Sequence, residues 1–208
     1  LSPKKIFPKH SFPRKTKQVM GSLPAKKISQ LILNLKKFYN IETLVETGTY
    51  RGVTTAWAAE HFRSVITIDI SLEYIKETQS SLASQTNIEY IHDDSRSALI
   101  ACMSRISGNA LFWLDAHKGG GYFGQDDDCP ILEEILAIHK FENDYIILVD
   151  DARAFLFPPQ PPFDHTKWPD IALVFDHLNL LGKRFIIIVE DIIISLPFTC
   201  MSISSLSP

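Results

Sequence analysis

Hydrophobic residues along the chain fall into short runs that alternate with stretches of helical periodicity. Five apolar runs, rich in β-branched and aromatic residues, predict buried strands at 43–46, 65–69, 88–91, 110–114 and 145–149. Between these runs, apolar residues recur with the period of a helix near 52–62, 72–84, 95–105 and 130–140. Because strands and helices alternate regularly, we expect a parallel sheet with helices on both faces.

The two ends of the chain depart from this alternation. Apolar positions from Ile28 to Phe38 predict an amphipathic helix before the first strand, and a further helix is expected near 169–181. The segment 184–197 holds two β-branched runs separated by only two acidic residues, so no crossover helix fits and the runs must pair as an antiparallel hairpin. The predicted fold class is α/β: a Rossmann-like, doubly wound, mostly parallel seven-stranded sheet with a C-terminal antiparallel hairpin.

Composition places the chain among ordinary globular proteins. It has 208 residues, of which 45% are hydrophobic and 22% charged, and this length suits one domain with a full core. No apolar run approaches the roughly 20 residues of a membrane helix, and the N-terminal residues lack the apolar segment of a signal peptide. Three widely spaced cysteines suggest neither a disulfide framework nor a zinc site. These features predict a cytoplasmic protein without a membrane span.

Charge is distributed unevenly. Residues 1–41 contain ten Lys or Arg and no acid, whereas the remaining 167 residues carry 11 basic and 24 acidic side chains. We therefore expect a basic N-terminal arm at 1–21 and a single domain at 22–208. The arm is either a solvated extension or a contact surface for phosphates, and it offers a surface for a homo-oligomer. Basic and aromatic residues are not interleaved as in single-strand binders, which disfavours nucleic acid as a partner.

The strand ends carry the first candidate site, because ligands bind beyond the carboxyl ends of parallel strands. The first strand runs through Glu46 into the turn ETGTYRG, in which Gly48 lets the backbone approach a ligand and Gly52 lets the following helix pack closely. Asp69 ends the second strand 23 residues later, at the spacing where an acid binds ribose hydroxyls. After the third strand, Asp94 opens a helix, either as its N-cap or as a ligand contact. Together these positions favour an adenosine-type ligand.

The fourth and fifth strands carry a second set of polar residues. Asp115 and His117 follow the fourth strand, and Asp150 and Asp151 follow the fifth. If these strands are neighbours, the carboxylates converge and raise one another's pKa unless a cation neutralises them. Oxygen ligands of this kind suit Mg²⁺, Ca²⁺ or Mn²⁺. The alternative is that Asp115 caps a loop and the other two are hydrogen-bonded strand-end carboxylates, with His117 either a general base or a loop residue.

The order of these strand-end motifs resembles a class I S-adenosylmethionine-dependent methyltransferase over residues 41–197. Tyr50 stands where the family's pattern has its middle glycine, and the turn lacks the third glycine of a dinucleotide fingerprint, which disfavours a nicotinamide oxidoreductase. The resemblance implies S-adenosyl-L-methionine as the cofactor, with its methionine part near Glu46 and Gly48, its ribose on Asp69 and its adenine near Asp94. The implied cofactor-binding residues are Glu46, Thr47, Gly48, Tyr50, Gly52, Asp69, Asp94 and Ser95.

The second set of residues is similar to that of metal-dependent O-methyltransferases acting on catechols and sugars. This resemblance implies Mg²⁺, or another hard divalent cation, on Asp115, Asp150 and Asp151, where it would orient a substrate hydroxyl and lower its pKa. His117 and Asp115 are the implied catalytic residues. The predicted function is S-adenosylmethionine-dependent methyl transfer to a hydroxyl of a small molecule or sugar, with assistance from a divalent metal. The alternatives are a metal-independent methyltransferase, with His117 or Asp115 as base, and a non-catalytic nucleotide- or nucleic-acid-binding module that uses the basic arm.

Three further segments lie near these residues. The glycine-rich stretch 117–125 is suited to a mobile lid. The acidic stretch 126–128 is interpreted as a solvated loop in which Asp128 caps the following helix. The long connection 152–168 contains prolines and four aromatic residues, suited either to binding substrate or to covering the sheet edge.

Overall fold

The computed structural model of the chain describes residues 26–117, 128–141, 145–157, 159, 163–180 and 182–198. The basic arm predicted at 1–21 and most of the glycine-rich stretch after His117 lie outside the described residues. The division into an arm and one domain at 22–208 therefore stays a prediction.

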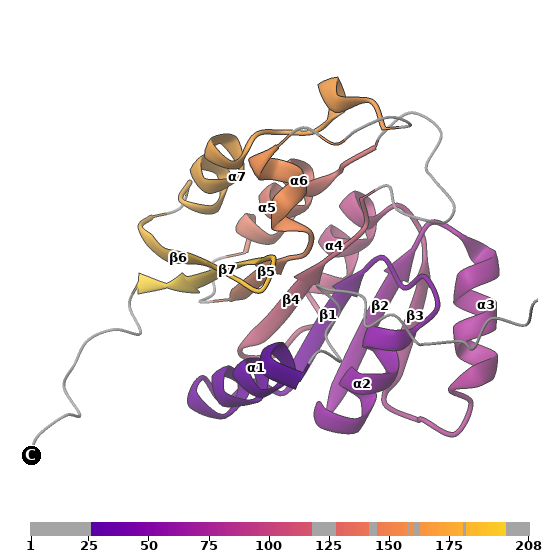
Figure 1. Cartoon of the computed structure of the whole chain (residues 1–208). Coiled ribbons are helices and arrows are strands. Elements are labelled where there is room, and N and C mark those ends of the chain that lie inside the picture. Colours follow the sequence, from indigo (N-terminus) through magenta and orange to yellow (C-terminus); the bar gives the residue numbers. More distant parts are fainter. Residues whose placement is uncertain are drawn as a thin grey trace, which may run out of the picture.

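The described part of the chain forms one seven-stranded sheet in the order β3-β2-β1-β4-β5-β7-β6 (Figure 1). The strands are β1 (Thr43–Thr47), β2 (Ser64–Asp69), β3 (Ile88–His92), β4 (Ala110–Leu114), β5 (Ile146–Val149), β6 (Arg184–Val189) and β7 (Ile192–Pro197). Strands β1 to β5 are parallel, whereas β7 runs antiparallel to both β5 and β6. The predicted α/β sheet and its C-terminal hairpin are confirmed. Strand order reverses between β1 and β4, which makes this the expected place for a ligand.

Helices cover both faces of the sheet (Figure 1). The helices are α1 (Lys26–Phe38), α2 (Val53–His61), α3 (Leu72–Ser81), α4 (Ser95–Met103), α5 (Ile131–His139), α6 (Ala152–Leu156) and α7 (Ile171–Leu178). One buried cluster joins α1 and α2 to the sheet, and a second cluster joins α4, α5 and α7 to the opposite face. The predicted helices are present, with ends that differ from the expected ones by a few residues. None of the helices in the described ranges is long and apolar enough to cross a membrane.

Burial on both faces explains the continuous apolar runs in the central strands. Every residue of β1, β4 and β5 is buried, as expected for parallel strands between two helical layers. The register pairs Thr47 with Leu114, and Leu114 with Val149. The residues that directly follow these three strands therefore leave the sheet at the same edge.

The long connection after β5 is more structured than the sequence indicated. It contains the short helix α6 and a 3-10 turn, η1 (His165–Lys167), where the sequence predicted an irregular loop. The expectation that Asp128 caps α5 is wrong, because Pro130 occupies that position. Asp128 is instead buried and accepts a hydrogen bond from the backbone N–H of Asp164 at 3.0 Å. This contact ties the segment before α5 to η1.

Candidate active site

The turn after β1 packs against the chain that leaves β4. Gly48 has φ of 84°, and its N–H donates to the carbonyl of Ile68 in β2 at 2.8 Å. A β-carbon at Gly48 would lie 2.2 Å from the carbonyl oxygen of Asp115. The sequence pattern predicted that this glycine lets the backbone approach a ligand. The structure shows close approach of the backbone after β4, so Gly48 brings the two halves of the site together.

The next residues of the turn are fixed by β2 and α3. Tyr50 adopts the left-handed φ of 44°. Glycine adopts this conformation without strain, which fits the middle glycine that the methyltransferase pattern has at this position. Its backbone N–H donates to Oδ2 of Asp69 at 2.8 Å. A β-carbon at Gly52 would lie 2.4 Å from the side chain of Thr78, so this glycine permits contact with α3 as well as the start of α2.

Asp69 is held at the end of β2 by backbone donors. Its Oδ1 accepts from the N–H of Ser71 at 2.7 Å, in addition to the bond from Tyr50 to Oδ2. Burial raises the pKa of Asp69, and the hydrogen bonds from Ser71 and Tyr50 oppose that rise. A carboxylate has about four acceptor positions, so these bonds leave room for a donor such as a ribose hydroxyl.

Asp94 is the N-cap of α4. Its carboxylate accepts from the backbone N–H of Arg96 at 2.9 Å and binds the Arg96 guanidinium through both oxygens, at 2.8 and 2.6 Å. Hydrogen bonding to the Arg96 side chain lowers the pKa of Asp94. Of the two roles that the sequence left open for Asp94, the structure contains the N-cap.

Glu46 lies beneath the turn rather than in it. The side chain is 1% exposed, and its Oε2 accepts from the hydroxyls of Thr55 at 2.5 Å and Thr67 at 2.7 Å. Burial raises the pKa of Glu46 to about 7, with the two threonine hydroxyls acting against this rise. Near neutral pH this carboxyl therefore populates both its charged and its neutral form.

A second buried acid, Glu134 in the first turn of α5, was missed by the sequence analysis. It is 1% exposed, and burial raises its pKa to about 7 against the lowering effect of hydrogen bonds from Ser95 and Thr47. The hydroxyls predicted to bind cofactor thus face Glu134. Its position three residues after Ile131 and one before Ile135, on the apolar face of the helix, was the available signal.

The carboxylates after β4 and β5 converge as the strand order requires. Burial raises the pKa of Asp150 to about 8, and the charge of Asp151 adds to this rise. The pKa of Asp115 is also well above its usual value, because of burial first and the charges of Asp150 and Asp151 second. His117 lies among them, with Nε2 at 3.4 Å from Oδ1 of Asp115 and 3.7 Å from Oδ2 of Asp151.

An arginine supplies positive charge to this cluster. Arg153, in α6, places Nη1 2.8 Å from Oδ1 of Asp151, and the same nitrogen contacts the carboxylate of Asp191 in the turn between β6 and β7. The sequence analysis did not identify Arg153 or Asp191. The only available signal was the position of Arg153 two residues after the acidic pair.

The arrangement does not fit a magnesium site with three carboxylate ligands. Asp151 is bound to Arg153, and Oδ1 of Asp150 accepts the backbone N–H of Asp151 at 2.8 Å. In the described ranges, no three His, Cys, Asp or Glu side chains are placed to hold one metal ion. The predicted ligands therefore lie together, but metal binding by them stays a prediction.

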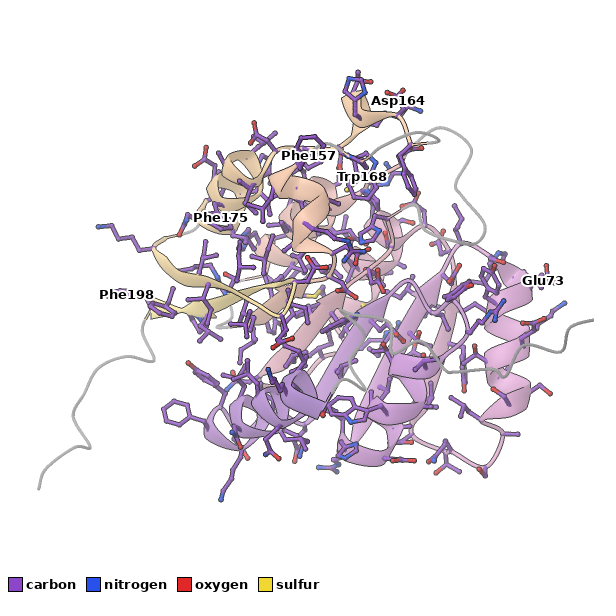
Figure 2. The ribbon with its side chains drawn as sticks, in the orientation of Figure 1. Glu73, Phe157, Asp164, Trp168, Phe175 and Phe198 are labelled. Atoms are coloured by element: carbon purple, nitrogen blue, oxygen red, sulfur yellow. The ribbon has the colours of Figure 1, made fainter. Side chains whose placement is uncertain are left out.

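Aromatic side chains pack beside His117. The ring of Trp168 lies 5.1 Å from that of His117, 5.8 Å from Phe155 and 6.1 Å from Phe163, measured between ring centroids. Figure 2 shows Trp168 below Asp164 of the η1 segment. The His117 side chain is only 5% exposed. Aromatic residues of the long connection thus border the residues predicted to be catalytic.

Strand order, terminal hairpin and the turn after β1 together give the fold of class I S-adenosylmethionine-dependent methyltransferases. The O-methyltransferase TomG from Streptomyces achromogenes, involved in tomaymycin synthesis and solved with SAM, is 16% identical, with a TM-score of 0.54 over 80% of this chain and 78% of TomG. An O-methyltransferase from Bacillus cereus, solved with SAH, is 13% identical, with a TM-score of 0.56 over 84% of each chain. No protein-family model and no curated protein matches the sequence. At these identities the likeness shows the fold.

Proposed function

We propose that the chain transfers a methyl group from S-adenosylmethionine to a hydroxyl of a small molecule or sugar. The observation that carries this proposal is the hydrogen bond from Tyr50 N–H to Asp69, which joins the turn after β1 to the acid at the end of β2. The turn itself lies next to the reversal of strand order between β1 and β4. The fold supports it further, since both similar O-methyltransferases were solved with SAM or SAH.

The cofactor-binding residues divide into direct and indirect ones under this proposal. Asp69 accepts the ribose hydroxyls, and the backbone from Gly48 to Gly52 lies along the rest of the cofactor. Thr47 and Ser95 act through Glu134, to which their hydroxyls are bonded. Glu46 lies beneath the turn after β1, and Asp94 caps the start of α4. When bound, S-adenosylmethionine supplies a methyl group activated by a positively charged sulfur, and the buried acids around the turn complement that charge.

The acceptor hydroxyl is activated next to His117. When the methyl group is transferred, the imidazole of His117 would accept the proton that the acceptor hydroxyl gives up. Asp115 and Asp151 lie within 3.7 Å of Nε2 and stabilise the positive charge that the imidazole gains. Methyl transfer requires the acceptor oxygen to approach the methyl carbon in line with the bond that breaks. Under this proposal, Trp168 positions the acceptor next to His117.

Metal assistance is the alternative way to activate the hydroxyl. The convergence of Asp115, Asp150 and Asp151 favours it, because a cation would relieve the repulsion that raises their pKa values. The ion pair of Asp151 with Arg153 opposes it. We therefore propose that His117 accepts the proton, and we keep activation of the hydroxyl by magnesium as the alternative.

Calorimetric titration of the chelator-treated protein with S-adenosylhomocysteine tests the central claim. We expect saturable binding that Asp69→Asn weakens by at least about tenfold, the equivalent of 1.4 kcal/mol. Asp93→Asn, at the end of the neighbouring strand β3, is the matched control and should bind normally. Absence of binding by the unmodified chain, or equal binding by Asp69→Asn, would contradict the proposal. The titration is then repeated with Mg²⁺ present. A separate heat of Mg²⁺ binding is expected for metal-assisted activation and not for metal-independent activation.

A further inference from the structure

The guanidinium of Arg153 belongs to an ion triad that links two distant parts of the chain. Asp151 follows β5, and Asp191 lies 40 residues later, in the turn of the C-terminal hairpin. Both carboxylates contact the same Nη1 of Arg153. The hairpin therefore contributes a side chain to the neighbourhood of the acidic cluster, although it contributes none of the residues that the strand-end motifs predicted.

Asp191 makes two contacts with Arg153 and a third with the neighbouring residue Ala152. Its Oδ1 accepts the backbone N–H of Arg153 at 2.8 Å, its Oδ2 contacts the guanidinium, and its carbonyl accepts the N–H of Ala152 at 2.8 Å. Only 11% of the Asp191 side chain is exposed. Both Asp151 and Asp191 adopt the left-handed conformation, with φ of 56° and 72°. The arginine head is therefore fixed although 61% of its side chain is exposed.

A fixed guanidinium and a divalent cation compete for the same oxygen atoms. Oδ1 of Asp151 is occupied by Arg153, and Oδ1 of Asp150 by the N–H of Asp151. The oxygen of Asp151 that faces the cluster lies 3.7 Å from His117, so it too has a positively chargeable neighbour. A metal ion bound to all three carboxylates would therefore compete with Arg153 for Asp151 and would lie close to its positive charge.

We propose that Arg153, clamped by Asp191, is the internal counter-ion of the Asp115–Asp150–Asp151 cluster and excludes divalent cations from it. The inference concerns the same site as the proposed function, but it does not depend on methyl transfer. It assigns to the β6–β7 hairpin the task of setting the charge of the acceptor site. It also predicts that cation binding is latent in this chain and is exposed when the arginine is removed.

Titration of Mn²⁺ into the chelator-treated full chain, followed by calorimetry and by loss of the free-ion electron paramagnetic resonance signal, tests the proposal. The unmodified chain should bind Mn²⁺ weakly, and Arg153→Gln should bind at least about tenfold more tightly. Arg153→Lys keeps the charge and should resemble the unmodified chain. The double variant Arg153→Gln with Asp150→Asn should lose the gained affinity, which would locate the ion in the cluster.

Arg105→Gln is the matched control, because it removes a surface arginine paired with Glu89 at 2.8 Å and changes the net charge equally. Asp191→Asn provides a second route to release Arg153 if the first variant does not fold. Tight Mn²⁺ binding by the unmodified chain would overturn the proposal, as would an Arg153→Gln variant that folds and gains no affinity. S-adenosylhomocysteine binding, measured on the same samples, reports separately on the proposed methyltransferase function.

Discussion

The α-carbon of Gly48 faces the carbonyl of Asp115 so closely that a β-carbon would stand 2.2 Å from its oxygen. Gly48 begins the turn that we assign to the cofactor, and Asp115 begins the acidic cluster that we assign to the acceptor. The two halves of the site thus share a backbone contact. A change in one half must displace the other, because neither backbone has room to move toward its neighbour.

Replacing Gly48 by alanine should destabilise the protein strongly. The change forces a side chain into a left-handed conformation and into the backbone after β4, and together these effects should cost about 3 kcal/mol or more. Urea denaturation followed by circular dichroism measures this loss. Gly108→Ala is the matched control, since its φ of 79° is similar but nothing lies within 4 Å of the added carbon. Equal losses for the two variants would show that the contact with Asp115 is unimportant.

Most of the fold could be predicted because its signals are local. Buried parallel strands require continuous apolar runs, and the absence of room for a crossover between the last two runs required a hairpin. The structure of 152–168 could not be predicted in the same way. Helix α6 has only five residues, too few for periodicity, and η1 depends on the Asp164 side chain accepting from the N–H of Thr166.

The site was predictable at strand ends and not elsewhere. Asp69, Asp115 and Asp150 follow directly from strand order, because the sheet fixes where each strand stops. Glu134 and Asp191 depend instead on how α5 and the hairpin turn pack against the sheet, which is a tertiary contact that no spacing in the sequence specifies. Ser95 was predicted to bind the cofactor, because its spacing in the sequence does not show that its hydroxyl is hydrogen-bonded to Glu134.

Asp94→Ala should lower stability by about 1 kcal/mol through loss of the N-cap of α4. Asp94→Ser keeps an oxygen that can accept the helix N–H, although it loses the ion pair with Arg96. That pair is about one-third exposed and adds little. Serine should therefore restore most of the loss in a thermal or urea denaturation experiment. If serine were as destabilising as alanine, the ion pair rather than the cap would be the stabilising interaction.

Glu134→Ala should destabilise the protein by about 2–3 kcal/mol, because it leaves the hydroxyls of Thr47 and Ser95 without their buried acceptor and opens a cavity. Glu133→Ala, at the exposed position next to it, should change stability by less than about 0.5 kcal/mol. Glu134→Gln keeps an acceptor oxygen and should be close to the unmodified chain at pH 4, where Glu134 is protonated in the fold. Urea denaturation of the three variants compares these effects, and a large loss in Glu133→Ala would contradict the burial pattern.

Stability should fall as pH rises because of Glu46. Its pKa rises from 4.5 in the unfolded chain to about 7 in the fold, so the folded state binds the proton more tightly. The stabilisation is complete below pH 4.5 and is lost as pH rises through about 7, amounting to about 3 kcal/mol. Glu46→Gln removes this dependence, since glutamine stays neutral while its oxygen still accepts from Thr55 and Thr67.

The variant and the unmodified chain should therefore be about equally stable at pH 4, whereas at pH 8 Glu46→Gln should be more stable by about 3 kcal/mol. Glu134 and Asp150 lose stabilisation in the same direction, so the informative quantity is the difference between the two proteins at each pH. Urea denaturation at intervals from pH 4 to pH 8 gives that difference. Glu60→Gln, at an exposed position of α2, is the control and should show none. A gap between Glu46→Gln and the unmodified chain that stays constant with pH would mean that Glu46 keeps its charge in the fold, and the buried carboxyl beneath the cofactor turn would then need a cationic partner.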